Sequence, residues 1–258
     1  MQGGSKERIH HRTTPEKMDN IGQSRKSIKR MKEFKIRCSQ IGKIVGTGKK
    51  NPLTQTAISY CKSWLKEQLY NRKIEFRSKY TEKGCIVEDE SIDFIGEQLG
   101  LGFLIKNDKQ FENDYFTGEP DILPPNLDLV IDAKNSWSWE TFPILESEIP
   151  TTDYYWQLQG YMSLTGRHHA KLCYVLSDTP QHLIEREARR YCYDSGFEEL
   201  DIDIYNKFLV NMTYSDVSEK LKIKVFDIER NDKDIVIAEN KVIECREFIS
   251  TLLKQTSC

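Results

Sequence analysis

The stretch Leu127-Asp128-Leu129-Val130-Ile131-Asp132-Ala133-Lys134, which follows the turn residues Pro124-Pro125-Asn126, decides the fold. Its apolar and β-branched residues after a turn predict a strand. Side chains on a strand alternate between two faces, so Asp132 and Lys134 share one face. The apolar Leu129, Ile131 and Ala133 share the other face. We therefore expect a strand that fixes an acid beside a base.

The pattern of apolar residues around this strand predicts an α/β fold with a central mixed β-sheet flanked by helices. Helix, strands, helix and strand follow one another through the middle of the chain, an order typical of a mixed sheet with helices on its faces. The expected helices span 39–45, capped by Ser39, then 53–65, 81–99, 151–164, 183–191 and 201–212, with a last helix ending near Leu253. The expected strands span 101–105, 115–116, 121–123, 127–134 and 171–176, with a hairpin of 223–228 and 234–238.

Charge is distributed unevenly along the chain. Residues 1–83 hold 21 Lys/Arg and 7 Asp/Glu, whereas 84–258 hold 17 and 33, although the net charge is only −2. Residues 1–34 are polar without hydrophobic periodicity, so we expect a flexible basic arm ahead of one domain over 35–258. A basic region suits phosphate backbones, and an acidic remainder supplies carboxylates for divalent metals. A solvated basic tail is equally consistent with charge alone.

Composition excludes several other classes of protein. With 38% hydrophobic and 30% charged residues, the 258-residue chain has a globular composition. No apolar run approaches the length of a membrane span and the N-terminus lacks a signal-peptide core, so we expect a cytosolic protein without a membrane partner. Seven cysteines without paired spacing predict reduced thiols and no zinc or iron–sulfur site.

A second carboxylate is predicted on an apolar helix face. Glu88 is in helical register with Ile92, Ile95 and Leu99, so it is expected to face the core while its acidic neighbours face solvent. A third carboxylate, Asp121, follows Pro120 at a strand start. Carboxylates hold Mg²⁺, which activates water, and a nearby ammonium orients that water. One Asp-x-Lys alone equally fits a surface ion pair, so the additional acids carry the metal hypothesis.

Short motifs in order resemble the PD-(D/E)XK nuclease superfamily and its restriction-endonuclease-like core, with Pro120-Asp121 as the first motif and Asp132-Ala133-Lys134 as the second. Three more motifs are similar to those of the phage lambda exonuclease-type (YqaJ-like viral recombinase) family. They are Arg37-Cys38-Ser39, Gly84-Cys85-Ile86-Val87-Glu88 and Tyr155-Trp156-Gln157-Leu158-Gln159. The resemblance covers roughly residues 37–176.

The resemblance implies a role for each matching residue. Glu88, Asp121, Asp132 and the carbonyl of Ala133 would bind Mg²⁺, or Mn²⁺ as a substitute, and Lys134 and Gln157 would position the nucleophilic water. Arg37 and Ser39 would hold a phosphate near the 5′ end of the substrate. A hydroxyl at a helix N-terminus beside a guanidinium is itself a competent phosphate site, although Ser39 acting only as a helix cap is the alternative.

The implied function is digestion of one strand of duplex DNA ends in the 5′→3′ direction in a bacterial or phage-infected cell, leaving a 3′ strand for a recombinase or a single-strand annealing protein. Two alternatives remain: an endonuclease or nickase of the same superfamily, and a non-catalytic DNA-binding protein that kept the fold. Some members of the family are ring-shaped oligomers, and the sequence does not decide whether this protein is a homo-oligomer.

Four further expectations concern surrounding residues. If Pro124–Asn126 formed a tight turn, Asp121 would pair opposite Leu129, about 10 Å of strand from Asp132, and a shared metal would need a bulge, a strong twist or an offset register. The aromatic residues Trp137, Trp139 and Phe142 are expected to pack in the core, with stacking on DNA bases as the alternative. The tyrosines 154, 155 and 161 are expected to be packing residues, and Glu187 is expected on a solvated helix face.

Overall fold

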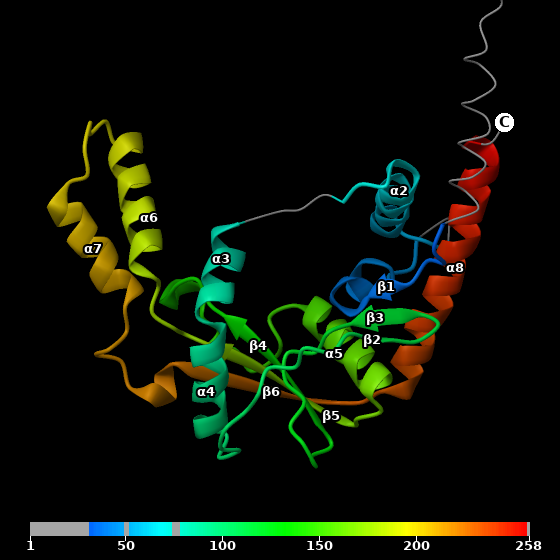
Figure 1. The fold of residues 1–258 in the computed structure, drawn as a ribbon, viewed down its shortest axis with the longest axis horizontal. Coiled ribbons are helices and arrows are strands. Elements are labelled where there is room, and N and C mark those ends of the chain that lie inside the picture. The colour runs from blue at the N-terminus through cyan, green and yellow to red at the C-terminus, as the bar shows by residue number, and fades with distance from the viewer. Residues whose placement is uncertain (1–30, 49–51, 74–77, 257–258) are drawn as a thin grey trace, which may run out of the picture.

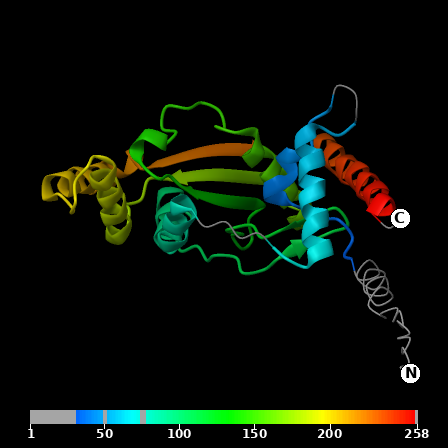
Figure 2. The ribbon, with the colours of Figure 1, turned by 90° about the horizontal axis from the view of Figure 1, so that it is seen from above.

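The computed structural model describes residues 31–48, 52–73 and 78–256. A mixed three-stranded sheet lies at its centre (Figures 1 and 2). β4 (Leu129–Asn135) runs parallel to β5 (His169–Val175), and β6 (Ile223–Glu229) runs antiparallel to β5. α5 (Thr152–Thr165) makes the crossover that two parallel neighbours require. The predicted mixed α/β fold is confirmed.

Each face of β4 packs against a different helix. Val130 belongs to the larger core, with residues of α5 such as Leu158. Ile131 belongs to a second core, with Ile92 and Ile95 of α4 (Glu88–Gln98). Because β4 is covered on both sides, the side chains of Asp132 and Lys134 lie between the strand and α5.

A second small mixed sheet lies beside the first. β3 (Phe116–Gly118) is its middle strand, parallel to β1 (Ile36–Arg37) and antiparallel to β2 (Phe111–Glu112). The 3₁₀ helix η1 (Cys38–Lys43) follows β1 directly and packs against α5. The chain after β3 crosses to the first sheet, where Ile122 forms an isolated bridge with Ile131. This crossing carries Asp121 to the edge of β4.

The remaining helices lie at the two ends of the molecule. α2 (Gln55–Tyr70) packs against the terminal helix α8 (Asp232–Thr256) at the right of Figure 1. α6 (Gln181–Asp194) and α7 (Ile202–Met212) pair at the left, where they extend away from the sheet. Two short 3₁₀ helices, η2 (Trp139–Thr141) and η3 (Glu219–Leu221), complete the fold.

The helix expected over 81–99 is wrong as a single element. It is divided into α3 (Lys79–Ile86) and α4 by Val87, whose φ of −96° and ψ of 8° leave the helical region. Lys83 of α3 is buried and donates hydrogen bonds to the carbonyls of Ser136 (2.8 Å) and Trp137 (3.0 Å). The break therefore lets α3 and α4 each contact the end of β4 in its own direction.

Two strand predictions are also wrong. Residues 101–105 form no strand because Gly100 and Gly102 adopt positive φ angles of 65° and 69°, which turn the chain. The hairpin of 223–228 with 234–238 does not form either, since 234–238 is the first part of α8. There Ile235, Ala238 and Val242 are buried at helical spacing, and β6 finds its partner in β5.

Most of the expected arm, residues 1–30, lies outside the described residues. Phe34 belongs to the core, where its ring makes edge contacts with Tyr60 and Trp64, and Arg246 donates to its carbonyl. The folded domain therefore includes the last residue assigned to the arm. In the described ranges, no helix is both long enough and apolar enough to cross a membrane.

Candidate functional site

The pairing of the crossing segment with β4 brings Asp121 next to Asp132. The amides of Ile122 and Ile131 each donate to the other's carbonyl, at 3.1 and 3.0 Å, which places Asp121 opposite Asp132 in an antiparallel register. The amide of Ala133 also donates to Asp121 Oδ2 at 2.8 Å. The turn is therefore longer than the tight form that would have set Asp121 opposite Leu129, and Asn126 adopts a left-handed conformation in it (φ 62°).

Asp132 is completely buried, and each of its two carboxylate oxygens contacts a different residue of the site. Its Oδ1 accepts a hydrogen bond from Gln157 Nε2 at 2.9 Å. Its Oδ2 lies 2.6 Å from Lys134 Nζ as an ion pair, but within the described part of the chain this oxygen accepts no hydrogen bond. The predicted placement of Asp132 and Lys134 on one strand face is thus confirmed by their contact.

The pKa values of the site reflect two carboxylates held close together. Burial, followed by the charge of Asp132, raises the pKa of Asp121 to about 7. Burial opposes the charge on Lys134, but the nearby carboxylates of Asp132 and Asp121 outweigh it and raise the pKa of the ammonium. One ammonium only partly compensates two adjacent carboxylates, so the site favours an additional cation.

Glu88 lies at the start of α4 rather than in the apolar core. Its side chain is 25% exposed and forms an ion pair with Lys106 Nζ at 2.6 Å. Lys106 in turn forms a bridge with Ile122, next to Asp121. Glu88 also contributes, as the smallest of the named causes, to the raised pKa of Asp121. The helix break therefore directs Glu88 toward the other two carboxylates, while Lys106 neutralises it.

The carboxylate oxygens of the site provide some, but not all, of the ligands that a divalent cation needs. Asp121 and Asp132 supply hard oxygen ligands, and Asp132 Oδ2 is a buried acceptor without a hydrogen bond. However, among the described residues no three Asp, Glu, His or Cys side chains converge as a ready metal site. The third carboxylate, Glu88, is paired with the ammonium of Lys106 instead.

Arg37 and Ser39 border a separate small cavity of about 350 Å³. Both side chains are exposed, and η1 has Arg37 at its N-cap position without any side-chain cap. The prediction that Ser39 caps a helix is therefore wrong, and its hydroxyl is left at the cavity wall. The other lining residues are Cys38, Gln110, Thr117, Gly118, Glu119 and Tyr161.

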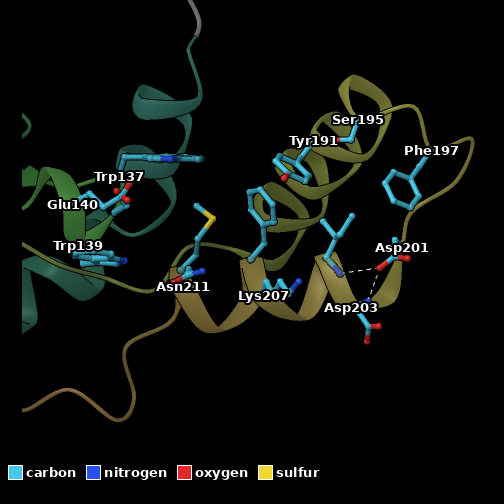
Figure 3. A pocket seen from close by; sticks show the side chains of 14 residues that line it. Trp137, Trp139, Glu140, Tyr191, Ser195, Phe197, Asp201, Asp203, Lys207 and Asn211 are labelled. Carbon is cyan, nitrogen blue, oxygen red and sulfur yellow. Dashed lines mark hydrogen bonds between the residues drawn. The ribbon is translucent and has the colours of Figure 1, made fainter.

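A larger cavity of about 680 Å³ lies between η2 and the α6–α7 pair (Figure 3). Trp137 and Trp139 line one side of it, and Tyr191 and Phe197 line the other. Trp139 is 54% exposed, so core packing is wrong for this residue, whereas Phe142 is buried as expected. The cavity is also lined by Glu140, Asp201, Asp203 and Lys207, a set that does not favour a phosphate backbone.

Several residues make contacts that the sequence analysis did not anticipate. Lys106 lies in an irregular segment, and its pairing with Glu88 depends on the fold. Tyr161 was expected only to pack, yet its hydroxyl accepts a hydrogen bond from Gln157 Nε2 at 3.0 Å. Glu187 is not solvated but buried between Lys79 (2.5 Å) and Arg190 (2.8 Å), because α6 packs toward α3 there.

Comparison with known proteins gives structural relatives only. A scan of protein-family models finds no match, and a search of curated proteins finds none. Among solved structures, a phage-related exonuclease from Haemophilus somnus 129PT is 26% identical, with a TM-score of 0.70 over 87% of this chain and 97% of that chain.

The alkaline exonuclease LHK-Exo from Laribacter hongkongensis is 15% identical, with a TM-score of 0.59 over 86% of this chain and 91% of its own. A second structure of LHK-Exo, in complex with dAMP, has a TM-score of 0.60 at 14% identity. These two likenesses concern the fold. Together with the motif order and the contacts of Asp121, Asp132 and Lys134, the likeness to the phage-related exonuclease supports the resemblance of this chain to the phage lambda exonuclease-type nucleases.

Proposed function

We propose that the protein is a Mg²⁺-dependent deoxyribonuclease that digests one strand of duplex DNA from an end in the 5′→3′ direction. The observation that carries this proposal is the contact of Asp121, Asp132 and Lys134 across two paired segments. A buried and a half-buried carboxylate beside one ammonium suit hydrolysis of a phosphodiester, and the phage-related exonuclease shares this fold at 26% identity.

The ligands of the cation would be Asp121 and Asp132, with the carbonyl of Ala133. Glu88 would join them by exchanging its ion pair with Lys106 for the cation. A bound divalent cation, Mg²⁺ or Mn²⁺, would lower the pKa of a water molecule and stabilise negative charge on the phosphate. The amide of Ala133 keeps Asp121 oriented, and Gln157 does the same for Asp132.

Lys134 would act on the water and on the developing charge. Its raised pKa keeps the ammonium charged at neutral pH, so it donates protons in hydrogen bonds but does not act as a general base. The ring of Tyr154 lies 5.2 Å from Lys134 Nζ and limits where the ammonium can move. Lys134 would therefore orient the water and stabilise negative charge beside Asp132.

Arg37 and Ser39 would bind the terminal 5′ phosphate in the 350 Å³ cavity. A guanidinium and a hydroxyl at one wall suit a phosphate dianion, and both are exposed to an incoming DNA end. The 3′ strand that remains would be the substrate of a recombinase or single-strand annealing protein. These roles favour the exonuclease over an endonuclease or nickase, which does not need a pocket for an end.

The test is cleavage of linear and covalently closed circular duplex DNA with Mg²⁺ or with EDTA. We expect digestion of the linear DNA only, in Mg²⁺ only, and faster from 5′-phosphorylated ends. Asp132→Asn and Lys134→Ala should abolish cleavage but retain most DNA binding, because they remove a cation ligand or the orientation of the water and leave the other contacts with the DNA backbone in place. Near wild-type cleavage by Asp132→Asn would reject the site, and cutting of closed circles would favour the endonuclease.

A further inference from the structure

Tyr161 is a packed aromatic residue that also contacts both halves of the proposed site. It lies on α5, one helical turn after Gln157, and is only 5% exposed. Its ring lines the cavity that holds Arg37 and Ser39, while its hydroxyl bonds to Gln157. The same side chain therefore lies between the phosphate cavity and the residue that contacts Asp132.

The hydrogen bonds of Gln157 depend on Tyr161. The amide nitrogen of Gln157 has two protons, and both are used: one on Asp132 Oδ1 at 2.9 Å and the other on Tyr161 Oη at 3.0 Å. Since the phenol oxygen accepts one proton of the amide, it fixes which way the amide faces. Removal of this oxygen would free the amide of Gln157 to rotate away from Asp132.

The hydroxyl of Tyr161 retains one unused hydrogen-bonding function. As an acceptor it receives the Gln157 bond, but among the described residues no acceptor is found for its own proton. Burial and the charges of Asp132 and Asp121 raise the pKa of this phenol, so the proton stays on it. A phosphate oxygen bound beside Arg37 and Ser39 would be a suitable acceptor.

The position of the ring depends on a glycine of β3. A Cβ atom added to Gly118 would lie 2.7 Å from Tyr161 Cε1 and 2.9 Å from Cys38 Sγ, well inside contact distance. Only glycine therefore leaves room for the ring between α5 and β3. Gly118 itself lines the cavity and lies three residues before Asp121.

We infer that Tyr161 is a positioning residue that couples phosphate binding at Arg37 and Ser39 to the orientation of Gln157 and Asp132. This inference rests on the proposed function and goes beyond it, because it makes the rate of cleavage, and not only the binding of DNA, respond to the 5′ phosphate. The ligand recognised is the terminal phosphate of a DNA strand.

The experiment measures kcat and KM on blunt duplexes with a 5′ phosphate or a 5′ hydroxyl. Tyr161→Phe keeps the ring but removes the oxygen. We expect kcat on the phosphorylated end to fall about ten-fold, the effect of one lost hydrogen bond, with KM little changed. The hydroxyl end should also lose activity, because Gln157 is freed on either substrate, but it should lose less, because only the phosphorylated end offers an acceptor for the phenol proton. Arg37→Ala should instead raise KM on the phosphorylated end alone.

Gly118→Ala provides a second variant, since its methyl group would displace the ring without removing the phenol. As in Tyr161→Phe, kcat on the 5′-phosphorylated duplex should fall relative to kcat on the 5′-hydroxyl duplex. The unfolding temperature of each variant shows whether the fold is intact. An equal loss on both ends, or no loss, in Tyr161→Phe would overturn the coupling. If the wild-type protein cleaves neither substrate in Mg²⁺, the proposed function fails instead, before the variants are compared.

Discussion

Individual charged side chains determine the chemistry of the site. Asp121 and Asp132 are adjacent, and only Lys134 among the described residues that contact Asp132 carries a positive charge. Burial and mutual repulsion raise the pKa of Asp121 to about 7, so the pair carries a cost that a bound cation would offset. Stability and the proposed metal binding would thus be linked through the same two residues.

The first prediction concerns Asp121→Asn. Removing one of two like charges should stabilise the metal-free protein by roughly 1–3 kcal/mol, since one pKa unit corresponds to about 1.4 kcal/mol. The Ala133 amide keeps an acceptor in the asparagine oxygen. Mg²⁺ should raise the unfolding temperature of the wild type but not of this variant.

Thermal unfolding with EDTA and with Mg²⁺ is the measurement, and Asp93→Asn, an exposed carboxylate on α4, is the matched control. The control should keep the wild-type response to Mg²⁺. A Mg²⁺ response that survives in Asp121→Asn would exclude Asp121 as a ligand.

A second prediction at this scale concerns the buried Lys83. Burial lowers its pKa from 10.5 to about 8. Between about pH 8 and 10.5 the unfolded chain binds more protons at this residue than the folded chain, so the stability contributed by Lys83 rises with pH across this window. Below pH 8 the cost of burying the charge is present in full.

Lys83→Met should remove this dependence. Relative to the variant, the wild type should gain on the order of 2–3 kcal/mol of unfolding free energy between pH 7 and 10.5. Urea unfolding of both proteins at several pH values measures the difference between their unfolding free energies. The contributions of the other titrating groups are common to both proteins and cancel in this difference. Parallel stability curves for the two proteins would mean that Lys83 does not titrate in this range.

Among the elements, α3 and α4 are the ones that set the position of Glu88. The break at Val87 lets Lys83 bond to the chain after β4, while Ser91 Oγ contacts the Val87 carbonyl (2.7 Å) and Asn135 Oδ1 (2.6 Å). Both helices are therefore attached to the strand end that follows Asp132 and Lys134. Packing of α4 against the turn at Gly102 completes this arrangement.

The third prediction compares one glycine in each helix. A Cβ at Gly96 of α4 would lie 2.2 Å from the Gly102 carbonyl oxygen, a backbone atom that moves only with the turn. Gly96→Ala should therefore lower the unfolding free energy by about 1–3 kcal/mol. Gly84 of α3 has no neighbour within 4 Å of such a Cβ, so Gly84→Ala should raise it by about 0.5–1 kcal/mol.

Chemical denaturation of both variants is the measurement, and the two changes are matched because each adds one methyl group to a helix. A neutral or stabilising Gly96→Ala would contradict the close contact between α4 and the turn.

At the scale of the whole molecule, the main feature is the opposite net charge of the two parts of the chain. Residues 1–83 carry an excess of 14 positive charges and residues 84–258 an excess of 16 negative charges. The acidic part supplies Asp121 and Asp132, and the basic part supplies Arg37. A strongly basic segment raises the affinity for DNA by releasing counterions, which makes that affinity depend on salt.

The fourth prediction concerns deletion of residues 1–30, which removes eight Lys/Arg and three Asp/Glu while leaving the buried Phe34 in place. DNA affinity should fall for all sequences alike, and log Kd should vary less steeply with log salt. Fluorescence anisotropy at several salt concentrations gives the slope. An unchanged slope would mean that these residues do not contact DNA.

Local patterns in the sequence were sufficient for much of the fold. The apolar spacing of α2 and α5 and the alternation along β4 predicted these elements, because both periodicities follow from backbone geometry. The placement of Asp132 beside Lys134 followed from the same alternation. The order of the short motifs was enough to indicate the nuclease family.

Only the tertiary structure decided which residues meet across elements. The register of Ile122 with Ile131 brings Asp121 to Asp132, the break at Val87 turns Glu88 to Lys106, and the packing of α5 on β3 places Tyr161 beside Gly118. Strand register and ion-pair partners depend on contacts between segments distant in sequence. No local pattern encodes these contacts, because their free energy arises only when the segments pack together.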